Sequence, residues 1–203
     1  MRYRKPQNYM EKLSLYRRYL FEEQALLQKG RWRLQFPNRN EKLMLEIGCG
    51  KGGYLLQQAE AHPHINYIGV ERNPALLLGT LKKIEESSAS NLLFCGFHAF
   101  AIDEYFAEGE VDRLYLNFSD PWPKNRNAKR RLTSRSFLDR YGRILSGRKQ
   151  LHFKTDNREL FEFSLMQLSE RGDLLTAIEL NLHSKKYEEG DERSILTEYE
   201  ENS

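Results

Sequence analysis

Cysteine and long hydrophobic runs are what this sequence lacks, and their scarcity narrows the class of protein. Its 203 residues include only two cysteines, Cys49 and Cys95, with no C-x-x-C pair or Cys/His cluster. Neither a disulfide framework nor a bound metal is therefore expected. No run approaches the roughly 18 apolar residues of a membrane-spanning helix, and residues 1–6 contain no apolar stretch typical of a signal peptide. We expect a soluble, cytoplasmic protein without a membrane partner.

The length fits one folded domain preceded by an extension. A typical domain holds about 150 residues, so 203 residues leave too little chain for two independent cores. A chain of this size buries roughly 70% of its unfolded surface, so it needs neither disulfide bonds nor a structural metal to fold. We predict a basic N-terminal extension over residues 1–41 and one domain over residues 42–203.

The formal net charge of +3 conceals blocks of opposite sign. Residues 1–33 carry nine basic side chains against three acidic ones, and residues 122–135 carry six basic side chains and no acid. The last sixteen residues instead hold seven acids and one arginine. Basic blocks favour a polyanionic partner, with nucleic acid as the leading candidate, although solvated faces and tails have the same composition.

Short apolar runs alternate with amphipathic stretches along the chain. The runs predict strands, and the stretches with helical spacing predict helices between them. Such alternation specifies right-handed crossovers and a buried parallel sheet. The predicted fold class is therefore α/β, with a doubly wound, mostly parallel sheet. The expected strands are 43–47, 66–70, 92–95, 112–118, 150–155 and 174–182, and the expected helices are 54–61, 74–86, 100–106, 134–145 and 158–169.

A glycine-rich segment, residues 48–53, follows the first expected strand and opens the first expected helix. Backbone amides in such a loop can face a ligand at a helix N-terminus. Gly48, Gly50 and Gly53 match the G-x-G-x-x-G pattern of dinucleotide sites. Gly48, Gly50 and Gly52 equally match the G-x-G-x-G pattern usual for S-adenosylmethionine sites. The loop alone leaves both cofactors open.

Two carboxylates near this loop separate the alternatives. Glu71 ends the second expected strand, where an acid can accept hydrogen bonds from both hydroxyls of a ribose in either cofactor. Glu46 stands two residues before Gly48 and would repel a pyrophosphate, whereas it would attract the ammonium and sulfonium charges of S-adenosylmethionine. The methyl donor is therefore the favoured cofactor.

The loop after the fourth expected strand carries the candidate catalytic residue. Pro121 and Pro123 fix the backbone on either side of Trp122, and Asp120 stands at the start of this stiff loop. Ligands of doubly wound sheets bind at the carboxyl ends of such strands. Asp-Pro-Trp is similar to the Asp-Pro-Pro-Trp and Asn-Pro-Pro-Tyr loops of amino methyltransferases, so a methyl acceptor on an exocyclic amine is one alternative.

Taken together, the motifs of this chain resemble those of the bacterial tRNA (guanine-N(7)-)-methyltransferases of the TrmB type, from about residue 41 to residue 200. The glycine loop by itself is not specific, but the combination is. The resemblance rests on the segments 46–52, 67–71, 116–124, 129–133, 152–157 and 197–200.

The resemblance implies a class I, Rossmann-like methyltransferase that transfers a methyl group from S-adenosylmethionine to a guanine in the variable loop of tRNA. It implies that Glu46, Glu71 and Asp120 contact the cofactor together with the glycine loop, and that Asp120 is catalytic. It also leaves a homodimer as an option. The residues that would contact tRNA are Lys124, Arg126, Lys129, Arg130, Arg131, Asp156, Thr197, Glu198, Tyr199 and Glu200.

The chemistry of the acceptor agrees with this assignment. Nitrogen 7 of guanine has a lone pair and no proton, so in-line attack on a sulfonium methyl needs positioning more than a strong base. The product ring gains positive charge, which the carboxylate of Asp120 can stabilise.

Two features depart from the family pattern. The acid expected after the third strand is replaced by His98, whose neutral imidazole can still accept a hydrogen bond through its unprotonated nitrogen. The family also continues beyond the acidic run into a final strand, whereas this sequence ends at Ser203. The sheet lacks that strand if the sequence is complete, and a shortened chain is the favoured explanation.

Three other functions stay open on the sequence. A nicotinamide-dependent oxidoreductase shares the glycine loop but is disfavoured by Glu46 and the basic blocks. An amino-directed nucleic-acid methyltransferase would use the Asp120 loop. A non-catalytic RNA-binding module on the same fold is compatible with His98 and the short C-terminus.

Overall fold

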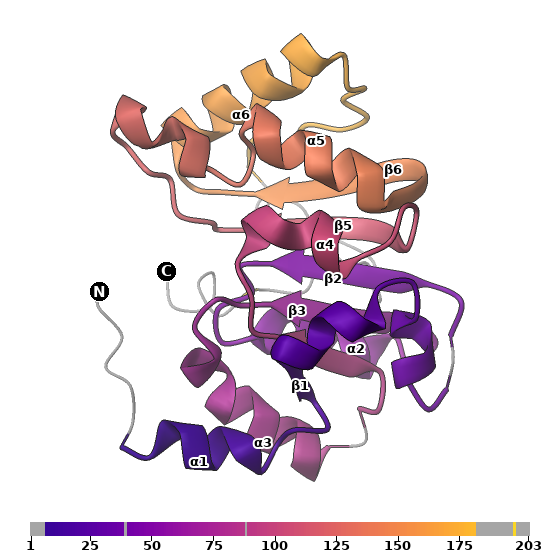
Figure 1. Cartoon of the computed structure of the whole chain (residues 1–203). Helices are drawn as coiled ribbons and strands as arrows, with labels where there is room; N and C mark the ends of the chain where they lie inside the picture. The colour runs from indigo at the N-terminus through magenta and orange to yellow at the C-terminus, as the bar shows by residue number, and fades with distance from the viewer. Residues whose placement is uncertain (1–6, 39, 88, 182–196, 198–203) are drawn as a thin grey trace.

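Six parallel strands form the central sheet of the computed structural model, which describes residues 7–38, 40–87, 89–181 and 197 (Figure 1). Their spatial order is β1-β4-β3-β2-β5-β6, and every pairing between neighbours is parallel. The expected α/β fold with a doubly wound sheet is thereby confirmed. The strands are β1 (Leu20–Phe21), β2 (Leu43–Ile47), β3 (Asn66–Val70), β4 (Leu92–Cys95), β5 (Val111–Asn117) and β6 (Leu145–Lys154).

Helices cover both faces of this sheet, because successive side chains of a strand point to opposite faces. In β2, Leu45 packs into a core shared with Phe137 of α5, whereas Met44 packs into a second core with Leu55 of α2 and Leu81 of α3. The helices are α1 (Tyr9–Ser14), α2 (Gly53–Ala61), α3 (Leu78–Glu86), α4 (Ile102–Tyr105), α5 (Arg135–Ile144) and α6 (Arg158–Arg171). Short 3₁₀ helices are η1 (Glu23–Gln28), η2 (Trp32–Gln35), η3 (Pro74–Leu77), η4 (Ala99–Ala101) and η5 (Asn125–Arg130).

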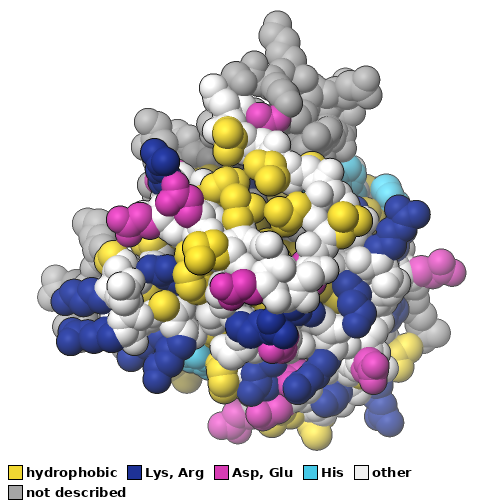
Figure 2. All heavy atoms as spheres, turned by 90° about the horizontal axis from the view of Figure 1, so that it is seen from above, with side chains coloured by type: hydrophobic (Ala, Val, Ile, Leu, Met, Phe, Trp, Pro, Cys, Tyr) yellow, Lys and Arg dark blue, Asp and Glu magenta, His cyan; other side chains and the backbone are white. Residues whose placement is uncertain are grey.

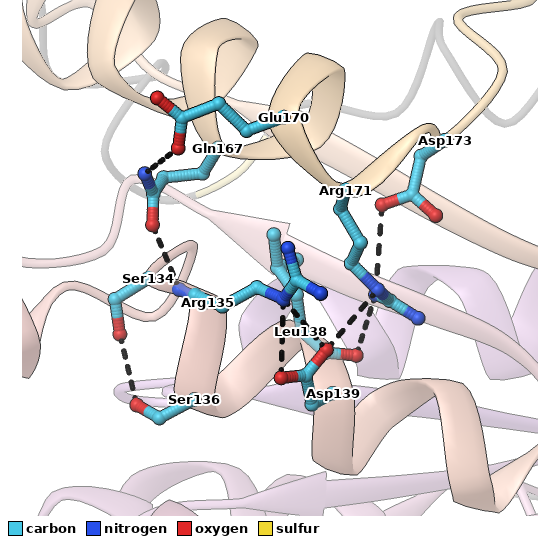
Figure 3. Close-up of polar contacts among 9 residues, drawn as sticks. All are labelled: Ser134, Arg135, Ser136, Leu138, Asp139, Gln167, Glu170, Arg171 and Asp173. Carbon is cyan, nitrogen blue, oxygen red and sulfur yellow. Dashed lines mark hydrogen bonds and ion pairs between the residues drawn. The ribbon is translucent and has the colours of Figure 1, made fainter.

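An arginine clamps α6 against α5 (Figure 3). Nη1 of Arg171 donates to the carbonyl oxygen of Leu138 at 2.6 Å, and Nε lies 3.4 Å from Oδ1 of Asp139. One turn earlier in each helix, the backbone N–H of Arg135 donates to the side chain of Gln167 at 3.0 Å. These contacts fix α6 relative to α5.

Part of the segment before β2 belongs to the sheet and its core. β1 lies beside β4, with Leu20 opposite Phe94, and extends the sheet at one edge. Trp32 is fully buried, and its indole N–H donates to the carbonyl oxygen of Tyr105 at 2.9 Å. A two-residue strand carries no periodicity, which is why the sequence did not predict β1. The division into residues 1–41 and 42–203 stays a prediction.

The strand predicted over residues 174–182 is wrong for residues 174–181, which form no strand; Leu182 lies outside the described residues. The alternating apolar residues there stay exposed, with Leu174 86% and Leu180 82% accessible. Figure 2 views the molecule from above Figure 1, the side on which α6 lies, and it shows hydrophobic side chains gathered on this face of the surface. A strand forms only where a neighbouring edge pairs with it, and local alternation cannot supply that edge.

Most predicted boundaries are confirmed to within a few residues, with two instructive differences. β6 begins at Leu145, five residues before the expected strand, and a register shift between Val111 and Arg113 accommodates the additional residues. The helix expected over residues 74–86 starts as a 3₁₀ turn at Pro74. None of the helices formed by the described residues is both long and apolar enough to span a bilayer.

Candidate active site

A cleft of about 770 Å³ opens at the carboxyl ends of the strands. It lies where the strand order reverses, since β3 flanks β2 on one side and β5 flanks it on the other. Doubly wound sheets bind their ligands at this switch point. Of the residues that the sequence singled out, those lining the cleft are Gly48, Gly50, Glu71, His98, Asp120, Lys129 and Arg130.

The glycine loop is fastened to the end of β3. The amides of Gly48 and Cys49 both donate to the carbonyl oxygen of Val70, at 2.8 and 3.2 Å. Gly52 has φ +80°, and a Cβ there would lie 2.7 Å from the ring of Phe94. Both the backbone conformation and the packing require glycine at that position. Gly52 therefore determines the conformation of the loop, but it is not among the residues that line the cleft.

Glu71 joins the glycine loop to the loop after β3. Its carboxylate accepts from the amide of Gly50 at 3.2 Å and from the amide of Asn73 at 2.8 Å. Burial raises the pKa of this carboxyl, and the negative charge of nearby Asp120 raises it further, while the two amide hydrogen bonds and Arg72 oppose the rise. Glu71 and Asp120 follow different strands and line the same cleft.

Glu46 is buried within β2, with 2% of its surface exposed, and does not line the cleft. Its Oε1 accepts from the side-chain amide of Asn117, at the end of β5, at 2.9 Å. Within the described part of the chain, Oε2 of Glu46 and Oδ1 of Asn117 have no hydrogen-bond partner. Burial raises the pKa of Glu46 from 4.5 to about 7, although Asn117 and Lys154 oppose the rise. The sequence missed Asn117, because its partner depends on the register between two strands.

Asp120 stands in a backbone segment with left-handed residues on both sides. Phe118 has φ +48° and Trp122 has φ +42°, conformations that cost free energy for residues other than glycine. The amide of Phe118 donates to the carbonyl oxygen of Lys154 at 2.9 Å, which fastens the start of the loop to β6. The carboxylate of Asp120 is exposed at the cleft. Strain of this kind gathers at functional sites.

His98 lines the cleft as the N-cap residue of η4. Its Nδ1 accepts from the backbone N–H of Phe100 at 3.2 Å. The proton of the neutral ring is then on Nε2, so the free nitrogen donates a hydrogen bond. The predicted contact of His98 with the cofactor stays a prediction.

The run of basic residues after the Asp120 loop divides into exposed and buried members. Lys124 and Arg126 are exposed without lining the cleft, whereas Lys129 and Arg130 are exposed and line it. The guanidinium of Arg130 lies 4.9 Å from the centre of the Trp122 ring. Residue 131 departs from its neighbours, because its side chain is buried. The tRNA contact predicted for Arg131 therefore falls on a buried side chain.

The remaining substrate positions lie apart from the cleft or outside the described residues. Asp156 follows β6 and is exposed, and Thr197 is buried with 7% of its surface accessible. The predicted contacts at Glu198, Tyr199 and Glu200 fall on residues that the structure does not describe.

An aromatic wall of the cleft was not predicted from the sequence. Phe97, Phe100 and Phe137 line it, from the segment after β4 and from α5. Phe97 stacks on Tyr105 at 3.7 Å between ring centres, and Phe100 packs edge-on against Phe137. The only available signal was the spacing of two phenylalanines around His98, which also fits an ordinary core. Flat apolar surface of this kind is suited to a planar ring.

Comparison with known proteins gives the same class of protein. A family model described as "Putative methyltransferase" matches residues 40–203. A tRNA (guanine-N(7)-)-methyltransferase of Geobacillus sp. (strain WCH70) is 44% identical over 191 residues, which cover 94% of this chain and 84% of that protein. One of Lachnoclostridium phytofermentans (strain ATCC 700394 / DSM 18823 / ISDg) is 49% identical over 173 residues, covering 85% of this chain and 79% of that protein.

A solved structure described as an antibiotic related methyltransferase has the same fold. It aligns with a TM-score of 0.50 at 20% identity and covers 66% of this chain and 69% of its own. At that identity the likeness concerns the fold alone. The fold, the cleft at its switch point and the curated relatives agree, and the chain belongs to the tRNA (guanine-N(7)-)-methyltransferase family.

Proposed function

We propose that this protein transfers a methyl group from S-adenosylmethionine to nitrogen 7 of a guanine in the variable loop of tRNA. The observation that carries the proposal is the composition of one cleft. Carboxylates that follow two different strands, Glu71 and Asp120, both line it. Lys129 and Arg130 stand at the same cleft and are exposed. The cleft thus offers carboxylates for the cationic cofactor and basic side chains for the tRNA phosphates.

The residues present suit the proposed cofactor. S-adenosylmethionine supplies an electrophilic methyl group on a sulfonium centre and carries an ammonium group. Oε2 of Glu46, Oδ1 of Asn117 and Oγ of Ser119 are buried near the ends of β2 and β5 and lack partners among the described residues. Unsatisfied acceptors of this kind suit a cationic donor. Glu71 is the candidate for the ribose hydroxyls, and His98 can donate to an acceptor on the cofactor.

For the transfer itself, the chain needs to orient and to stabilise charge. A guanine nitrogen 7 has no proton to lose, so no residue must act as a base. The bond from this nitrogen to the methyl carbon forms as the carbon–sulfur bond breaks, and the positive charge passes to the purine ring. Asp120 would stabilise that charge electrostatically, and the aromatic wall would orient the ring.

The proposed tRNA surface consists of the exposed basic residues beside the cleft, Lys124, Arg126, Lys129 and Arg130. Their charges would neutralise phosphates without reading sequence. Asp156 is exposed and would contact the tRNA away from the cleft. The contacts expected at Thr197, Glu198, Tyr199 and Glu200 stay predictions. We further propose that the protein acts in the cytoplasm, where tRNA is found, and that a homodimer is an available assembly.

The test is a single-turnover reaction with methyl-labelled S-adenosylmethionine and bulk tRNA, followed by digestion and identification of the labelled nucleoside. The proposal requires 7-methylguanosine from the variable loop, and it requires the Asp120→Asn variant to bind tRNA while transferring methyl more slowly. Label on an exocyclic amine would instead identify an amino-directed methyltransferase. tRNA binding without transfer would identify a non-catalytic RNA-binding module.

A further inference from the structure

Arg131 differs from the basic residues that precede it in the chain. Only 6% of its surface is exposed, whereas Lys129 and Arg130 are exposed. A buried guanidinium loses its hydration and must recover hydrogen bonds inside the protein. Its partners therefore indicate what it is there to hold.

Those partners are two consecutive carbonyl groups of the Asp120 loop. Nε of Arg131 donates to the carbonyl oxygen of Pro121 at 3.0 Å, and Nη2 donates to that of Trp122 at 3.2 Å. The guanidinium also lies 4.4 Å from the centre of the Phe163 ring on α6. A planar fork of donors can bind both carbonyls and stack on a ring at once, which a lysine ammonium cannot do.

The loop has a physical need for such a clamp. Trp122 is left-handed at φ +42°, and Phe118 is left-handed at φ +48°, so Asp120 stands between two unfavourable conformations. Pro121 and Pro123 have no N–H, which removes two donors that a turn would ordinarily use to hold itself. A donor from elsewhere in the fold has to supply the missing hydrogen bonds.

The clamp is itself fixed to the body of the domain. The amide of Arg131 donates to the carbonyl oxygen of Ala128 at 3.0 Å, and the amide of Ser134 donates to that of Arg131 at 2.9 Å. Thr133 is fully buried and accepts from the hydroxyl of Ser164 in α6 at 2.7 Å. A continuous set of contacts thus runs from α6 to the carbonyl groups of Pro121 and Trp122.

We propose that Arg131 is a positioning residue, which holds the Asp120–Trp122 turn in the cleft and does not bind RNA phosphate. Two consecutive arginines then hold the same turn from different sides. Arg130 lies against the ring of Trp122 and stays open to the solvent, while Arg131 binds the backbone carbonyls from within. This inference rests on the proposed role of Asp120 in methyl transfer.

The test compares Arg131→Lys and Arg131→Ala with the same substitutions at Arg171. Arg171 is a matched control, because its guanidinium also donates to a backbone carbonyl, that of Leu138, and clamps α5 to α6 (Figure 3). Its ion pairs are with Asp139 and Asp173, neither of which belongs to the Asp120 loop. Steady-state kinetics give kcat and KM for tRNA, calorimetry gives cofactor affinity, and thermal unfolding shows how much of each variant is folded.

A spectroscopic readout reports on the loop directly. The chain has two tryptophans, and Trp32 is fully buried, so acrylamide quenching of fluorescence reports mainly on Trp122. In both Arg131 variants, quenching should increase and kcat should fall by ~10- to 100-fold, the scale of a displaced reacting group. KM for tRNA and the salt dependence of tRNA binding should stay within twofold of the parent. Added guanidinium should restore part of the rate to Arg131→Ala.

Other outcomes overturn the proposal. A parent-like kcat in Arg131→Lys would show that the clamp is not needed for the reaction, and this variant decides the matter if Arg131→Ala does not fold. Weaker tRNA binding with a log-log salt slope reduced by about 0.7 to 0.9 would mark Arg131 as a phosphate contact. Equal losses in the Arg171 variants would make the effect one of stability alone. If Asp120→Asn keeps the parent rate, the proposed mechanism fails, whereas the quenching of Trp122 still tests the clamp.

Discussion

Replacing Glu46 by glutamine separates the charge of this buried residue from its shape. The amide keeps an acceptor for Asn117, which donates to Oε1 at 2.9 Å, and removes the ionisable proton. In the parent, burial raises the pKa of Glu46 from 4.5 to about 7. The folded protein therefore binds this proton more tightly than the unfolded chain does. The stability that follows is fully present below pH 4.5 and is lost as the pH rises through about 7.

The size of the effect follows from that rise. It corresponds to about 3 kcal/mol in the free energy of unfolding at pH 8, where the parent keeps a buried carboxylate and the Glu46→Gln variant does not. Urea unfolding of both proteins from pH 5 to pH 8 gives the difference, in which groups common to both, Glu71 included, cancel to first order. The variant should be the more stable protein at pH 8, and its advantage should shrink toward pH 5.

Cofactor binding should respond in the opposite direction. If the Glu46 carboxylate receives a cationic group, parent affinity should rise by up to tenfold for each pH unit below about 7 and level off above it. The glutamine variant should bind more weakly at pH 8 and lose most of this dependence, as calorimetry can measure. Parallel pH profiles of stability in the two proteins would refute the burial argument. Equal cofactor affinity at pH 8 would refute the role of the charge.

Three further predictions concern the cleft. Asp120→Asn should lower the single-turnover rate by ~10²-fold and leave tRNA affinity unchanged, because an amide cannot stabilise a cationic ring; an unchanged rate would remove Asp120 from the mechanism. Glu71→Ala should weaken cofactor binding by roughly 1 to 3 kcal/mol in calorimetry, since a charged acceptor is removed; equal affinity would reduce Glu71 to support of the glycine loop. Joint replacement of Arg126, Lys129 and Arg130 by alanine should flatten the log-log salt slope of tRNA binding by about 0.7 to 0.9 for each phosphate that is no longer neutralised. The parent slope in that variant would move the RNA surface elsewhere, with cofactor affinity as the folding control.

The strands at the centre of the fold could be predicted because buried parallel strands leave a local signature. β2, β3 and β4 are short apolar runs with glycine or polar residues beyond them, and each agrees with its predicted span. Edge elements leave no such signature. β1 is two residues long and exists because β4 pairs with it, while the apolar alternation after α6 met no partner strand among the described residues. Pairing is a property of the assembled sheet, and a single segment does not contain it.

The candidate site divides in the same way. Gly48, Gly50 and Glu71 lie where strand–loop–helix order requires them, because the cleft forms at strand ends whatever the side chains. The hydrogen bond from Asn117 to Glu46 depends instead on the register between β2 and β5, which places a residue at the end of one strand beside an earlier residue of its neighbour.

The basic residues after the Asp120 loop show why tRNA contacts are hard to predict from charge alone. In the sequence, Arg130 and Arg131 are two equivalent members of one basic block. In the fold, Arg130 is open to the solvent against an indole ring, and Arg131 is turned inward toward two carbonyl groups. The difference arises because the prolines of the loop leave its carbonyls without local donors, and the nearest guanidinium that the backbone directs inward supplies them. Whether an arginine can bind a phosphate is therefore decided by the unmet hydrogen bonds around it, and the charge count of its segment does not contain that information.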